Sequence, residues 1–161
     1  MYSLKSLSIL LLFLLLSGCK EAPYSTQNSA YIVFKTERFK YADMGFIYEN
    51  NERVKVEIYG SGQALMTLTL TKEAVCMRQM QCMTKATFNR KVLSRDYPEE
   101  ILTHILEGKP IFDGYHKVEK RNGFTQKVVK RDKYHIEYSV LNKQILFHDT
   151  INEILIKVIK Q

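Results

Sequence analysis

The sequence predicts a mainly β (α+β) fold: a curved, incomplete antiparallel β-barrel of about ten strands, with two central helices covering its concave apolar face. Apolar and polar residues alternate over short segments in both halves of the chain, as in strands with one buried face. Between these segments the apolar residues take helical spacing. A twisted sheet of this size tends to curl, and amphipathic helices need an apolar surface to cover.

The first half of the chain has the pattern of an antiparallel meander with one apolar face. The segment from Tyr31 to Lys40 is rich in strand-forming residues, and three later segments alternate with a period of two. Turn-forming residues separate them at positions 50–51 and 60–62. The alternating apolar positions are Met44, Phe46 and Tyr48; Val54, Val56 and Ile58; and Met66, Leu68 and Leu70.

The middle of the chain predicts two helices. Thr84 can cap a first helix that runs through Phe88, Val92 and Leu93. Asp96 is expected to cap a second helix, with Pro98 and two glutamates in its first turn. Its apolar stripe ends at Gly108 and consists of Ile101, Leu102, Ile105 and Leu106.

The last third returns to strands. Val118 precedes a hairpin signal at Asn122-Gly123. A period of two follows at Tyr134, Ile136 and Tyr138, and residues 144–148 and 153–159 complete the sheet.

Residues 1–18 are expected to be a lipoprotein signal peptide. Lys5 gives a positive start, and residues 7–15 form an apolar run that is too short for a permanent membrane span. Residues 16–19 (Leu-Ser-Gly-Cys) resemble the bacterial lipobox. This resemblance implies that Cys19 takes a diacylglycerol and becomes the new N-terminus. Lys20 follows in place of the Asp of an inner-membrane retention signal, which favours an outer-membrane anchor.

The composition fits one domain after this leader. The chain has 161 residues, of which 45% are hydrophobic and 25% charged, with 7 Gly and 3 Pro. We expect residues 19–29 to be the lipidated Cys and a flexible tether, and residues 30–161 to be the domain. A net charge of +7 fits anionic lipid or an acidic protein, whereas export from the cytoplasm excludes nucleic acid.

The remaining cysteines, Cys76 and Cys82, are an even pair in an oxidising compartment, so we predict a structural disulfide. No CxxC spacing or nearby His pair indicates zinc or a redox site.

The inward apolar side chains are candidates to line a cavity between sheet and helices, and the alternative for each is a filled core. The candidates are Met44, Phe46, Tyr48, Met66, Leu68, Leu102, Ile105 and Leu106.

With these elements in order, the chain resembles the outer-membrane lipoprotein receptor family LolB and its periplasmic relative LolA. The resemblance rests on the lipobox, the hairpin at residues 54–70, the helix and Gly-Pro turn at residues 98–110, and the closing strands at residues 134–138 and 153–158. It implies a half-closed barrel with a helical lid and an acyl-binding cavity. It also implies a monomer that accepts acylated lipoproteins from a LolA-like periplasmic carrier and inserts them into the outer membrane, without cofactor or catalysis.

The family also has an exposed apolar residue on a protruding hairpin loop, which inserts into the bilayer. By position this implies Leu65, with Tyr59 as the second candidate. The alternative for Leu65 is an ordinary, partly covered strand residue.

Other patterns favour plain structural roles. The basic hairpin of Lys117, Lys120, Arg121, Lys127, Lys130, Arg131 and Lys133 fits a solvated edge or a docking site for an acidic carrier or anionic lipid. Four scattered His residues lack metal-ligand spacing, and no nucleophile or phosphate-binding motif is present. Glu99 and Glu100 are interpreted as helix first-turn charges. Two functions from other classes stay open: a structural or host-interaction surface lipoprotein, and a related lipid-binding transporter.

Overall fold

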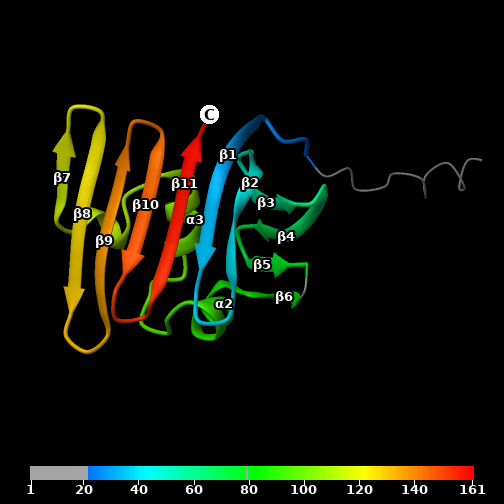
Figure 1. Ribbon diagram of the computed structural model, residues 1–161. Helices are drawn as coiled ribbons and strands as arrows, with labels where there is room; N and C mark the ends of the chain where they lie inside the picture. Colours follow the sequence, from blue (N-terminus) through cyan, green and yellow to red (C-terminus); the bar gives the residue numbers. More distant parts are fainter. Residues whose placement is uncertain (1–21, 79) are drawn as a thin grey trace, which may run out of the picture.

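The computed structural model describes residues 22–78 and 80–161, and in this part of the chain the strands form one eleven-stranded antiparallel sheet (Figure 1). The fold is mainly β, as the sequence predicts, and the sheet is open. Its strand order is β6-β5-β4-β3-β2-β1-β11-β10-β9-β8-β7. Sequence neighbours pair with each other except at one place, where β1 pairs with β11.

Six strands precede the helices. The first five bury alternate residues over at least part of their length, which is the pattern of a strand with one covered face. The sixth has no buried residue. The six strands are β1 (Thr26–Lys35), β2 (Lys40–Glu49), β3 (Val54–Gly60), β4 (Gln63–Leu70), β5 (Ala74–Met77) and β6 (Met80–Thr84).

Five strands follow the helices and return to the start of the chain. They are β7 (Lys117–Lys120), β8 (Gly123–Lys130), β9 (Tyr134–Leu141), β10 (Gln144–Asp149) and β11 (Ile154–Lys160). The hairpin forms as predicted, but its turn lies at Arg121-Asn122, one residue before the predicted Asn122-Gly123, and Gly123 already pairs with Lys120. Strand β11 then pairs with β1 in antiparallel register, from Ala30 opposite Lys160 to Lys35 opposite Leu155.

Two helices and one 3-10 turn connect these halves: α2 (Lys85–Val92), α3 (Ile101–Glu107) and η1 (Phe112–Gly114). The Thr84 side chain caps α2 by accepting from the Thr87 amide, as predicted. Gly108 ends α3 in the left-handed conformation, at φ 69°, also as predicted. The predicted cap at Asp96 is wrong: α3 begins later, Glu100 is the cap residue, and the Asp96 carboxylate pairs with Lys133 instead.

The core lies between one face of the sheet and the two helices. Figure 1 shows α2 and α3 on the same side of the sheet, with β3–β6 running across the direction of β1. Helix α3 contacts β3 and β10, and α2 contacts β5 and β6. The inward residues of all these elements form one buried apolar cluster. The fold therefore has two layers, sheet and helices, with the apolar material between them.

Two expectations from the sequence differ from the structure. Four or five strands were expected before the helices and the structure has six, because the Cys, Met and Gln residues of β5 and β6 give no clear alternation. The flexible tether expected at residues 19–29 is also wrong over its second half, since β1 begins at Thr26 and pairs with β2 from that residue. Ala22 is already fixed, because its carbonyl accepts from Asn50 and Arg53. Residues 1–21, which include the signal peptide and Cys19, lie outside the described part.

The close approach of β2 and β3 depends on one glycine. A Cβ at Gly45 would stand 2.0 Å from the carbonyl oxygen of Glu57 and 3.1 Å from Cδ1 of Ile32. A glycine in a strand interior often marks such an approach of two backbones. Because the nearer atom belongs to the backbone, it cannot rotate away.

Gly45→Ala is expected to destabilise the protein by about 3 kcal/mol, since it forces β2 away from β3. The measurement is the free energy of unfolding in urea. The matched control is Gly62→Ala in the β3–β4 turn, where a Cβ meets open space and only the positive φ of 77° opposes it, at a cost of about 1 kcal/mol. Equal losses in the two variants would contradict the proposed backbone clash.

Candidate functional site

The apolar interior between sheet and helices is the candidate site. It contains five of the eight side chains predicted to line a cavity: Met66, Leu68, Leu102, Ile105 and Leu106. The first two point inward from β4, and the other three form the buried stripe of α3. Each is at most 1% exposed. The structure thus brings these five together, in a space that their own side chains fill.

The other three predicted cavity residues lie on the opposite face of the sheet. In β2 the inward positions belong to Gly45 and Ile47, whereas Met44, Phe46 and Tyr48 point outward. The prediction was wrong for these three. Strand β2 carries apolar residues on both faces, and the larger side chains, which were expected to face the core, point outward. Cross-strand register decides the matter: Ile47 pairs with the buried Val56, and Tyr48 with Lys55.

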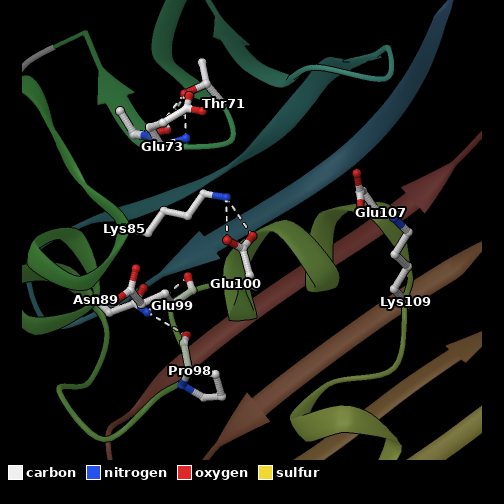
Figure 2. Close-up of polar contacts among 10 residues, drawn as sticks. Thr71, Glu73, Lys85, Asn89, Pro98, Glu99, Glu100, Glu107 and Lys109 are labelled. Carbon is white, nitrogen blue, oxygen red and sulfur yellow. Dashed lines mark hydrogen bonds and ion pairs between the residues drawn. The ribbon is translucent and has the colours of Figure 1, made fainter.

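The helices that cover this interior are fastened to each other by polar contacts (Figure 2). The Lys85 ammonium on α2 donates to both carboxylate oxygens of Glu100, at 2.9 and 2.6 Å. The Lys85 side chain is 5% exposed, so the ion pair is shielded on one side. Next to it, the Asn89 amide donates to the Pro98 carbonyl at 2.8 Å. These two contacts hold the start of α3 against α2.

A pocket of about 340 Å³ opens beside this ion pair. Its wall includes Lys85 and Glu100, residues of α3, and the β2–β3 and β4–β5 turns. The α3 residues on its wall are Thr103, His104 and Glu107, from the polar side of the helix. The pocket is therefore a mainly polar surface pocket beside the ion pair.

A second group of polar contacts joins the segment between the helices to the sheet. The Tyr97 hydroxyl donates to the Asp149 carboxylate, which is fully buried at the end of β10. The same carboxylate accepts from the Asn152 amide at 2.7 Å and from the backbone N–H groups of His135 and Ile151 at 3.0 and 2.9 Å. Burial alone would raise the pKa of Asp149, but these hydrogen bonds outweigh it and lower that pKa below its usual value. Burial, together with the bond to Asp149, raises the pKa of Tyr97.

A third group of hydrogen bonds holds the segment that follows α3 against the sheet. The Gln126 side chain on β8 accepts from the Ile111 amide and donates to the carbonyls of Ile111 and Tyr115, at 2.8 to 2.9 Å. The Tyr138 hydroxyl on β9 donates to the Lys109 carbonyl at 3.0 Å. Burial raises the pKa of Tyr138, so it stays a neutral donor. These bonds satisfy backbone groups of a segment that has little regular structure.

The remaining predicted residues lie outside this interior. A disulfide bond joins Cys76 to Cys82 across β5 and β6. Leu65, at the start of β4, is 44% exposed and follows the β3–β4 turn. Tyr59 is on the outer face, and its hydroxyl donates to Glu57. The basic hairpin lies on the β7 edge of the sheet and the strands beside it.

The interior of the described part of the chain is a buried apolar cluster. Among residues 22–78 and 80–161, no group of three or more His, Cys, Asp or Glu residues could hold a metal ion. No helix in the described part of the chain is long and apolar enough to cross a membrane. Comparison of the chain with models of known protein families and with curated proteins finds no match.

Sequence reasoning missed the buried polar residues that hold α2, α3 and the segments beside them in place. Lys85, Asn89, Tyr97, Gln126 and Asp149 are all buried, although four of these types usually lie at the surface. Their partners are up to 52 positions away in the chain. No local spacing signals such pairs. The only indication was Glu100, which was interpreted as a first-turn helix charge.

Removing Glu100 is expected to harm stability more than removing its partner. Glu100→Ala leaves the buried Lys85 ammonium without its carboxylate, which costs about 2 kcal/mol. Lys85→Met removes the buried charge and keeps most of the packing, so its cost is smaller. Urea unfolding of both variants measures the difference. Glu119→Ala, which breaks an exposed ion pair with Lys117, is the control and should be nearly neutral. A larger loss for Lys85→Met than for Glu100→Ala would contradict this account.

The buried carboxylate predicts a pH dependence. Because the pKa of Asp149 is lowered by folding, its stabilisation is complete above the unfolded value, near pH 4, and is lost as the pH falls through the folded value. Asp149→Asn should therefore lose about 2 kcal/mol at pH 7 and progressively less below about pH 4. Thermal melts between acid and neutral pH measure this. Asp132→Asn, with an 89% exposed side chain, should show no such trend; a loss for Asp149→Asn that is independent of pH would rule out the explanation.

Proposed function

We propose that this chain is an outer-membrane lipoprotein that accepts acylated lipoproteins from a LolA-like periplasmic carrier and inserts them into the outer membrane. In this proposal Cys19 carries the lipid anchor and the protein faces the periplasm as a monomer. The sheet is the wall of a half-closed barrel, and α2 and α3 are its lid. The interior lined by Met66, Leu68, Leu102, Ile105 and Leu106 receives the acyl chains.

The observation that carries the proposal is the combination of an apolar interior with a cover held on by few polar contacts. Cargo acyl chains lose about 0.8 kcal/mol for each methylene exposed to water, so a carrier must shield them. The inward residues of the sheet and the α3 stripe provide one continuous apolar surface. The contacts Lys85–Glu100, Asn89–Pro98 and Tyr97–Asp149 hold the lid and its following segment.

Loading then requires the lid to move. With Leu102, Ile105 and Leu106 at 1% exposure, the helix side chains occupy the space that acyl chains would take. Cargo binding would replace the contacts of these side chains with contacts to acyl chains. It would also break the contacts Lys85–Glu100 and Asn89–Pro98. Transfer runs downhill if this protein binds cargo more tightly than the carrier and the bilayer binds it more tightly still.

A second function is favoured by one observation, the burial of the five interior side chains, each at most 1% exposed. A structural or host-interaction surface lipoprotein needs a packed core and no lid movement. It would bind its partner through the face of the sheet opposite the helices. Measuring cargo transfer separates the two functions, and a domain that binds free lipid but accepts no lipoprotein would point to a related lipid transporter.

The test is transfer in vitro from a carrier loaded with a triacylated lipoprotein to the unlipidated chain that starts at Lys20. We expect cargo to move to this chain and Leu102→Glu to abolish the transfer, because a carboxylate on the buried stripe opposes acyl chains. Association of cargo with the receptor is measured by affinity separation.

The control for charge is Val129→Glu on the outward face of β8, where the residue is 53% exposed; this variant should retain transfer. The control for folding is Leu102→Met, which keeps volume and polarity. Thermal melts show whether each variant is folded. A folded native chain that takes up no cargo rules out the acceptor function and leaves the surface lipoprotein.

A further inference from the structure

The outer face of β2 and β3 carries an aromatic patch, which we define as Tyr24, Phe46, Tyr48 and Tyr59. The rings form a chain with neighbouring centroids 5.5 to 6.1 Å apart, from Tyr24 to Tyr48, Phe46 and Tyr59. All four are partly exposed. Three of them stand on the face opposite the core, so their presence there is not explained by packing of the interior.

Two cations border the patch. The Arg53 guanidinium lies 4.5 Å from the centre of the Tyr24 ring, and the Lys55 ammonium lies 4.2 Å from that of Tyr48. One carboxylate, Glu57, is paired with Lys55 at 3.1 Å and accepts from the Tyr59 hydroxyl at 3.0 Å. The carboxylate charge of Glu57 is thus balanced within the patch by Lys55.

Apolar residues extend the patch across the neighbouring strands. Met44 of β2 is 39% exposed and stands opposite Tyr31 of β1, which is 38% exposed. Tyr31 in turn pairs with Ile159 of β11. A row of three outward apolar side chains therefore continues the aromatic patch over β11, β1 and β2.

The chain leaves the domain beside this patch. The Ala22 carbonyl accepts from Asn50 and Arg53, at 3.2 and 2.8 Å, and Tyr24 belongs to the patch itself. Only Lys20 and Glu21 separate Ala22 from Cys19. Three Cα steps reach at most about 11 Å. An anchor on Cys19 must therefore hold the edge of the aromatic patch close to the bilayer.

We propose that this outer face, the aromatic patch with Arg53, Lys55, Tyr31 and Met44, is the surface on which the protein lies on its membrane. Tyrosine rings favour the boundary between acyl chains and headgroups, since one end is apolar and the other forms hydrogen bonds. Arg53 and Lys55 lie beside these rings, at the level at which tyrosine rings meet the lipid headgroups. The lid lies on the other side of the sheet, so this orientation leaves it turned toward the periplasm.

This inference rests on the proposed lipidation of Cys19 and adds the orientation of the domain. Its test uses the full lipidated protein in vesicles of phosphatidylethanolamine and phosphatidylglycerol with brominated acyl chains. The sequence contains no Trp, so one introduced Trp reports its own environment. Met44→Trp is expected to lose roughly half of its emission to the bromine atoms, since a side chain at this boundary lies within their range.

Tyr115→Trp is the matched control. Tyr115 is 57% exposed and lies on the helix side of the sheet, since its carbonyl accepts from Gln126, an inward residue of β8. It should keep its emission. Thermal melts check that the variants fold, and Tyr31→Trp replaces Met44→Trp if that variant does not.

The outcomes separate this inference from the function proposed above. Flotation with vesicles together with quenching at position 44 but not at position 115 supports it. Flotation with equal quenching, or with none at position 44, overturns the orientation and leaves the transport function standing. Native protein that does not float with the vesicles overturns the anchor at Cys19, and with it both the membrane site and the proposed location.

Discussion

The pairing of β1 with β11 is the constraint on which the rest of the structure depends. Without it, each half of the chain would be a separate meander with an additional open edge. Six residue pairs join the two strands, and the ion pair between Lys160 and Glu49 and a bond from the Gln161 amide to Ser29 extend the junction. Because the partners are more than 100 positions apart, the sheet is completed only when the last strand arrives, and the domain forms as one unit.

The junction also places the interior opposite the helices. Ile32 and Phe34 of β1 and Ile156 and Val158 of β11 give the middle of the sheet its buried face. Helix α3 reaches both halves, since it contacts β3 on one side and β10 on the other. The polar contacts of the segment between the helices are also divided between the two halves of the sheet. Lys85–Glu100 belongs to the first half and Tyr97–Asp149 binds the second, so the segment between the helices is tied to both.

Much of this fold follows from local patterns. Period-two alternation predicts β3, β4, β9 and β11, Thr84 predicts the start of α2, and Gly108 predicts the end of α3. The prediction fails where the sequence pattern is compatible with two different structures. Strand β2 has apolar residues on both faces, and only its register with β3 selects Ile47 over Phe46. Asp96 resembles a cap, but a lysine 37 positions away takes its carboxylate. Buried polar partners such as Gln126 are determined by the folded geometry and not by spacing.

The two free edges of the sheet are unequal. Every residue of β7 is exposed, and three of its four side chains are charged: Lys117, Glu119 and Lys120. At the other edge, β6 is closed against β5 by the bond between Cys76 and Cys82. Growth of a filament by strand addition needs the β6 edge of one copy to pair with the β7 edge of the next. Because the charges on β7 must be brought beside a second chain each time, this geometry opposes polymerisation at its first step. The protein can therefore reach a high local concentration without joining its sheets edge to edge.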